Sequence, residues 1–170
     1  ATANWWAIKG HAEGNLWIAG DKGVWKIRDG LWSAVDLGEG VNLSAVRSIW
    51  VAGPDDAWFV GTGGLIRQVS NDQPKTLDIA GADLNAIDGV DGEVWAVGER
   101  GRTLRYNGDV WFDYLPVTLR DLHAVHAPAA EDAWVTGDAG TVLRWDGAQW
   151  RVHTEVEHVD LRGVHVTAEG

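Results

Sequence analysis

Short stretches of alternating hydrophobic and polar residues follow one another along the whole chain, separated by glycine-rich turns. No long window keeps a helical period, whereas alternation over about four to eight residues is typical of β-strands. The last complete repeat shows the pattern best, and it predicts strands at 122–127, 133–136, 141–145 and 149–153. Asp146-Gly147, between the last two strands, predicts a tight hairpin turn with positive φ. The chain is therefore predicted to be all-β.

The strands belong to a repeat whose anchor is Trp, two residues, Gly, two residues, Gly. Successive anchor tryptophans lie 41, 37 and 39 residues apart, and they are Trp17, Trp58, Trp95 and Trp134. In three of the four repeats a turn and a further tryptophan follow the anchor. A period of this length is typical of propeller blades or solenoids, because one small sheet cannot bury both of its apolar faces alone. Radial stacking of four-stranded antiparallel sheets into a β-propeller is the predicted arrangement.

The repeat boundaries predict one propeller domain over residues 1–170, with blades at about 4–40, 41–81, 82–118 and 119–159. A fifth copy of the first strand, at 160–170, has no anchor after it. A closed ring of four blades has no place for this strand, so we expect the chain to be part of a larger ring. Two alternatives stay open: assembly with other chains to complete the ring, or a strand that caps an open sheet edge.

The segment from Asp132 to Trp150 resembles the Trp- and Gly-rich propeller repeats of myxobacterial and other bacterial exported proteins. These repeats are related to BNR or Asp-box propellers, which include sialidase-like folds and the photosystem II assembly factor family. The resemblance implies a propeller fold along the whole chain. Of the Asp-box, only Asp-Gly-x-x-Trp is present, and neither Tyr106 nor Tyr114 has a matched acid. Sialidase chemistry is therefore not expected for this chain. The Trp-Asp dipeptide that marks WD repeats occurs once, at Trp145-Asp146.

Composition narrows the classes of partner. The net charge of −11 disfavours nucleic acid and anionic membranes, because phosphate groups require a basic patch. The absence of cysteine excludes disulfides and thiolate metal sites. No apolar stretch is long enough to span a membrane. Ala1-Thr2-Ala3 matches what remains around a small-residue cleavage site, which predicts an exported protein; the alternative is a fragment of a longer chain.

The first strand of each blade is expected to line the central channel of a propeller. The residue after the apolar pair of this strand changes from repeat to repeat, which makes it a candidate for binding a small polar ligand: Lys9, Arg47, Asp88, His126 and His165. His123, before the pair in the fourth repeat, is a further candidate. The alternative is that these side chains face a water-filled channel.

Histidines among these candidates suggest a metal site, which the spacing argues against. His123 and His126 lie three apart on one strand and point to opposite sides, so they are poor joint ligands. His126 and His165 occupy equivalent positions of neighbouring units, where their side chains can converge. We predict no metal and no cofactor.

The pair Trp5-Trp6 is the most unusual feature outside the repeat. Adjacent residues of a strand point to opposite faces, so one of the two indoles is expected to be exposed. An exposed tryptophan suits stacking on a sugar ring or anchoring a protein partner.

No residue set forms a catalytic signature. The predicted function is a non-enzymatic binding or assembly scaffold that recognises a protein partner within a larger complex. A carbohydrate-binding, lectin-type propeller is the first alternative, and a sialidase-like glycoside hydrolase is the second.

Overall fold

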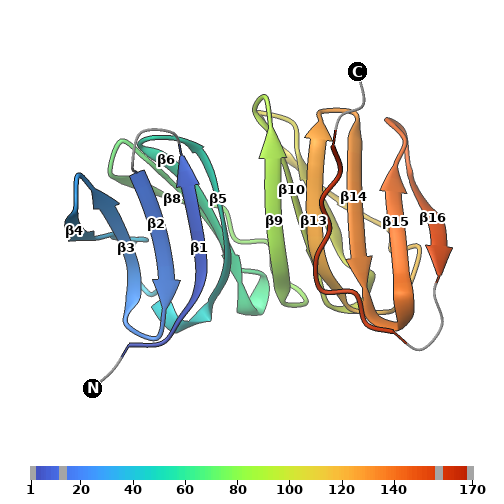
Figure 1. Ribbon diagram of the computed structural model, residues 1–170, viewed down its shortest axis with the longest axis horizontal. Coiled ribbons are helices and arrows are strands. Elements are labelled where there is room, and N and C mark those ends of the chain that lie inside the picture. The colour runs from blue at the N-terminus through green and yellow to red at the C-terminus, as the bar shows by residue number, and fades with distance from the viewer. Residues whose placement is uncertain (1–2, 12–14, 156–158, 168–170) are drawn as a thin grey trace. The chain divides into compact units, whose positions relative to one another are not determined.

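A computed structural model of the chain describes residues 3–11, 15–155 and 159–167. It contains four antiparallel four-stranded sheets, and in each sheet the strands follow one another in chain order (Figure 1). The chain divides into two compact units, Ala1–Asp83 and Leu84–Gly170, with two sheets in each. The predicted all-β fold of four-stranded blades is confirmed.

The first unit contains blades 1 and 2. Blade 1 is formed by β1 (Trp5–His11), β2 (Asn15–Gly20), β3 (Gly23–Arg28) and β4 (Leu31–Ala34). A short 3₁₀ turn, η1 (Leu43–Ala45), precedes blade 2. Blade 2 is formed by β5 (Val46–Gly53), β6 (Asp56–Gly61), η2 (Thr62–Gly64), β7 (Ile66–Ser70) and β8 (Gln73–Thr76).

The second unit contains blades 3 and 4. Blade 3 is formed by β9 (Leu84–Val90), β10 (Glu93–Gly98), η3 (Glu99–Gly101), β11 (Thr103–Tyr106) and β12 (Trp111–Tyr114). Blade 4 is formed by β13 (Leu122–Ala129), β14 (Asp132–Gly137), η4 (Asp138–Gly140), β15 (Thr141–Trp145) and β16 (Trp150–Glu155). These last strands lie within two residues of the bounds that the alternation predicts.

The predicted first strand of a fifth blade is not paired into a sheet. Residues 159–167 are not assigned to a strand and have no ladder partner among the described residues. Residues 168–170 lie outside the described part of the chain. The segment nevertheless runs along β13 and β14 (dark red in Figure 1). Leu161 N donates to the carbonyl of Gly137 at 3.0 Å, and the Thr136 hydroxyl donates to the carbonyl of Gly163 at 3.4 Å.

The two glycines of each anchor are required for different reasons. The first is extended, as at Gly61 with φ −178°, so a left-handed conformation does not explain it. A Cβ on Gly61 would lie 1.9 Å from the carbonyl oxygen of Ala45, so close backbone approach excludes a side chain. The second glycine does adopt positive φ, as at Gly140 with φ 69°.

Each anchor tryptophan lies opposite a polar residue of the third strand. Lys26, Arg105 and Arg144 lie over the rings of Trp17, Trp95 and Trp134, with their cationic groups 4.9–5.1 Å from the ring centroids. An acid of the second strand holds two of these cations: Glu93 pairs with Arg105 at 2.5 Å and Asp132 with Arg144 at 2.8 Å. The cation of these three blades is therefore structural.

In blade 2 the polar residue opposite the anchor tryptophan is not a cation. Gln68, and not Arg67, lies opposite Trp58. Arg67 lies opposite Phe59, where it is buried and binds the carboxylate of Asp78 and the carbonyl of Leu37.

The hairpin turn of blade 4 gives a pH prediction. The Arg151 guanidinium, followed by the backbone N–H of Gln149, lowers the pKa of Asp146 from 3.8 to about 2. A carboxyl whose pKa is depressed by folding stabilises the folded state above its unfolded pKa, and this contribution is lost as pH falls through the folded pKa. We expect Asp146→Asn to melt below the wild type at about pH 5, and the difference to disappear near pH 2. A melting difference that stays constant over this range would contradict the assignment.

Candidate functional site

Blade 1 exposes a sheet face made of uncharged, mostly apolar side chains. Two cross-strand rows build it, one from β1 to β4 and one from β2 to β4. We call this surface the blade 1 outer face, and its members are Ile8, Leu16, Ile18, Trp25, Ile27, Trp32 and Ala34. Ile8 is 64% exposed and Trp32 is 53% exposed. Ile18, in the middle of the sheet, is buried under its neighbours at 7% exposure, and the remaining large side chains of the face are half-buried. Large apolar side chains are seldom left in water together in this way, so the face is a candidate interface.

The same positions are buried in the other blade of this unit. In blade 2, Ile49 lies opposite Phe59, and Ala57 lies opposite Val69. All four belong to one apolar cluster that also includes Trp17 of blade 1, whose ring centroid lies 5.9 Å from that of Phe59. In blade 2 this face is therefore covered by the anchor face of the preceding blade.

Blade 4 repeats this packing in the second unit. The equivalent rows contain Val135, Leu143, Trp145 and Trp150, which are at most 5% exposed. They cover Trp95 of blade 3, whose ring lies 5.1 Å from Trp145 and 5.3 Å from Trp150. In both units, therefore, the face equivalent to the blade 1 outer face is covered by the neighbouring sheet, which packs its anchor tryptophan against it.

Trp5 is 40% exposed and Trp6 is 46% exposed. The alternation of the strand predicted that only one of the two indoles would be exposed. Trp5 extends the outer face, because its ring lies 6.1 Å from that of Trp32, which in turn lies 6.5 Å from Trp25. Trp6 turns the other way, and its indole N–H donates to the carbonyl of Val46 in blade 2 at 2.6 Å. A β-bulge between Trp5 and Ala7 breaks the strict alternation of the strand.

The predicted channel residues of the first unit do not form a common site. Lys9 is exposed on β1, opposite Trp17. Arg47 pairs with Asp83 at 2.7 Å, and Asp83 also accepts the backbone N–H of Gly63 at 2.8 Å. Arg47 therefore helps to hold the loop that follows blade 2.

Three of the predicted residues do meet in the second unit. His126 Nδ1 lies 2.9 Å from the buried carboxylate of Asp88, and the rings of His126 and His165 lie 4.7 Å apart. The other ring nitrogen, Nε2, lies 3.1 Å from the carbonyl of Val166. The expected convergence of the two histidines is therefore present, and it attaches residues 159–167 to β13. Ligand binding at this cluster stays a prediction.

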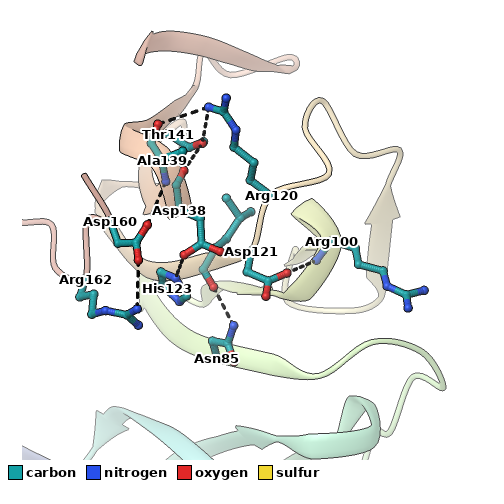
Figure 2. A network of polar contacts seen from close by, with 11 residues as sticks. Asn85, Arg100, Arg120, Asp121, His123, Asp138, Ala139, Thr141, Asp160 and Arg162 are labelled. Atoms are coloured by element: carbon teal, nitrogen blue, oxygen red, sulfur yellow. Dashed lines mark hydrogen bonds and ion pairs between the residues drawn. The ribbon is translucent and has the colours of Figure 1, made fainter. Parts of the chain in front are cut away.

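His123 lies apart from this cluster, in a polar network that Figure 2 shows. Its Nε2 lies 2.5 Å from Asp138, at the turn between β14 and β15. Asp121 accepts the backbone N–H of Arg100 at 2.8 Å, and Asp160 accepts that of Ala139 at 3.1 Å. Both bonds join the loop before a first strand to the anchor turn of the preceding blade.

These aspartates are not among the residues predicted from the sequence. A signal was available, because Asp-Leu recurs at Asp83, Asp121 and Asp160, each time where a first strand or its fifth copy begins. Asp121 and Asp160 join successive repeat units of the second half, and Asp83 binds the anchor turn of blade 2 in the first.

Three shallow cavities of about 250–370 Å³ lie within single units, and none of them is lined by the predicted site residues. Among residues 3–11, 15–155 and 159–167, no three histidine, aspartate or glutamate side chains are placed to hold a metal ion. No helix in this part of the chain is long and apolar enough to cross a membrane.

No protein-family model matches the chain, and no curated protein matches it either. Several solved structures do. U3-55K covers 89% of this chain at a TM-score of 0.76 and 12% identity. The WD40 β-propeller domain of Doa1 covers 87% at a TM-score of 0.69 and 12% identity. The fold is that of a β-propeller.

The likeness has two limits. The chain spans about half the length of these solved chains, 52% of U3-55K and 53% of the Doa1 chain. The identities are too low to carry more than the fold. The RRP9 WD40 repeats match in the same way, with a TM-score of 0.76, 12% identity and coverage of 89% of this chain and 51% of that one. The narrower resemblance to exported BNR or Asp-box propellers stays a prediction.

Proposed function

We propose that the chain is a non-enzymatic propeller module that binds a protein partner through the blade 1 outer face. One observation carries the proposal: Ile8 and Trp32 are exposed on blade 1, whereas the equivalent Ile49 of blade 2 and Trp150 of blade 4 are buried against another sheet. The partner that fits is a protein presenting a flat, apolar sheet face, because such a face covers the equivalent positions within each unit. The module thereby acts as an assembly scaffold in a larger complex or ring.

The chemistry of the face favours protein over other partners. It carries no charged side chain, so burying it removes no ionic group from water. Tryptophan is enriched at the energetic centres of protein interfaces, and Trp25 and Trp32 stack edge to face here. Elsewhere the net charge of −11 keeps the protein soluble and favours a partner with a basic rim.

We expect Trp32→Ser to weaken partner binding more than tenfold while lowering the free energy of unfolding by only about 1–2 kcal/mol, because Trp32 is half-exposed but packs on Trp5 and Trp25. The measurement is titration of the copurified partner against wild-type and variant protein, with urea unfolding of both. Leu119→Ser is the matched control, because Leu119 is an exposed apolar residue of the other unit, at 78% exposure. Equal binding by all three proteins would contradict the proposal.

A lectin-type function is the second candidate, supported by the platform that Trp5 and Trp32 form. Their rings lie 6.1 Å apart and are tilted by 43°, and aromatic faces of this kind stack on sugar rings. A glycan array tests it. Binding to a defined glycan that Trp5→Ala abolishes would favour the lectin, whereas an empty array would remove it.

Export belongs to the same proposal. It is supported by the resemblance of the repeat to those of exported bacterial proteins. Fractionation of the cells that make the protein tests it, since recovery in the cytosol alone would contradict export.

A further inference from the structure

A groove lies between the last strands of blades 3 and 4, within the second unit. It has a volume of about 370 Å³ and separates the end of β12 from the turn before β16. Its walls are Tyr114, Leu115 and Val117 on the blade 3 side and Ala148, Gln149 and Trp150 on the blade 4 side. We call it the rim groove, because β12 and β16 are the outermost strands of their sheets.

Leu115 departs from the repeat in a way that the fold does not require. It follows the residue that ends the ladder with β11, as Asp36 and Asp78 follow the corresponding residues of blades 1 and 2. Leu115 is 91% exposed, and the two aspartates are exposed as well. The position therefore faces water in all three blades, and of these three only blade 3 places an apolar side chain there.

Leu115 has exposed apolar neighbours. Phe112 is 45% exposed and Val117 is 44% exposed. The Phe112 ring lies 6.4 Å from the ring of Tyr114, which forms part of the groove wall. A single exposed leucine is ordinary, whereas a group of such side chains beside a groove marks an interaction site.

Contacts within the fold fix both walls of the rim groove. The Tyr114 ring packs on Trp145 at 5.0 Å. On the blade 4 side, the Asp146 carboxylate accepts the backbone N–H groups of Ala148 at 3.1 Å and Gln149 at 3.0 Å. Because the walls are already ordered, a ligand loses little affinity to the cost of arranging them.

The charge that the rim groove presents to solvent is negative. Of the described residues that line it, Asp113 alone is charged. Its partner Arg102 lies 3.3 Å away with a side chain only 8% exposed, whereas the side chain of Asp113 is 49% exposed. A ligand therefore meets a carboxylate next to an apolar wall, and the net charge of −11 adds to the attraction of a cation.

We propose that the rim groove binds a short extended segment of a partner protein, in which a large aliphatic side chain has a lysine or arginine beside it. The aliphatic side chain enters between Leu115 and the blade 4 wall, and the cation pairs with Asp113. A hydroxyl-rich ligand fits less well, because Leu115 and Val117 offer it no side-chain hydrogen bond. The groove is separate from the blade 1 outer face, and its binding does not depend on the partner proposed there.

A labelled Gly-Ser-Lys-Leu-Lys-Ser-Gly peptide, titrated with the full chain and followed by fluorescence anisotropy, tests the site. We expect saturable binding, at least tenfold tighter than that of peptides with serine in place of leucine or glutamate in place of both lysines. Leu115→Asp gives blade 3 the residue type of Asp36 and Asp78, so it should weaken binding at least tenfold without changing the urea midpoint of unfolding. Leu119→Asp is the matched control and should bind normally, because Leu119 is 78% exposed but does not line the groove.

Asp113→Asn is the second variant. It should remove the preference for the lysine peptide over the glutamate peptide and keep the preference for leucine over serine. Trp32→Ser should bind the peptide normally, which separates the rim groove from the blade 1 outer face.

No saturation up to about 1 mM of the leucine peptide, the weak limit of specific binding, would overturn the proposal. Equal affinity for the leucine and serine peptides would overturn it as well, because charge attraction alone would then explain the binding. Normal binding by Leu115→Asp, or an equal loss in Leu119→Asp, would show that the peptide binds elsewhere.

Discussion

Replacing Trp95 with alanine is expected to destabilise the second unit by about 3–5 kcal/mol, the usual cost of removing a buried tryptophan. Trp95 is fully buried between Trp145 and Trp150, and Arg105 lies over its ring at 5.1 Å. Its removal leaves a cavity and also removes the apolar surface that joins blades 3 and 4. Hydrogen exchange followed by mass spectrometry should show lost protection in 84–155 and unchanged protection in the first unit.

Phe112→Ala is the control for this variant. Phe112 is an aromatic residue of the same blade but is 45% exposed, so its loss should cost about 1 kcal/mol or less. Equal losses of protection in the two variants would show that the anchor tryptophan does not hold the blades together.

Gly61→Ala is expected to cost about 3 kcal/mol, at the upper end of the range for overpacking. The new Cβ would lie 1.9 Å from the carbonyl oxygen of Ala45, and backbone cannot move aside as a flexible side chain can. Urea unfolding measures the change. The anchor glycine would then be required for close approach and not for a left-handed turn.

Gly63→Ala separates these two explanations. Gly63 has φ 69° with open space around its Cβ, and Ala139 already occupies the equivalent position of blade 4 with φ 49°. The variant should therefore cost about 1 kcal/mol, the usual penalty for a left-handed non-glycine residue. A larger loss for Gly63→Ala than for Gly61→Ala would reverse the assignment.

The repeat made the fold predictable because each sheet is built from local signals. Alternation located β13 to β16 within two residues, and Asp146-Gly147 marked the hairpin turn. The reason for the first anchor glycine was not predictable, because it depends on the Ala45 carbonyl, which belongs to η1, before the first strand of the blade. The position of Arg67 was not predictable either, because it lies next to Gln68, the residue opposite Trp58, and only the register of the strands separates the two.

The candidate site was predictable only in part. Spacing placed His126 and His165 at equivalent positions, and they do meet. It could not show that Ile8 and Trp32 are exposed, because the equivalent positions of blade 4, Val125 and Trp150, are buried. Exposure depends on what stacks on a sheet, and a repeat pattern is the same for a covered and an uncovered blade.

Site-specific photo-crosslinking in the intact assembly tests the central claim most directly. A photoreactive amino acid at position 8 or 32 lies on the blade 1 outer face, and one at the exposed position 75 of blade 2 lies outside it. Our account predicts that positions 8 and 32 crosslink to the same protein and that position 75 does not. Equal crosslinking at all three positions, or no protein adduct at positions 8 and 32, would contradict it.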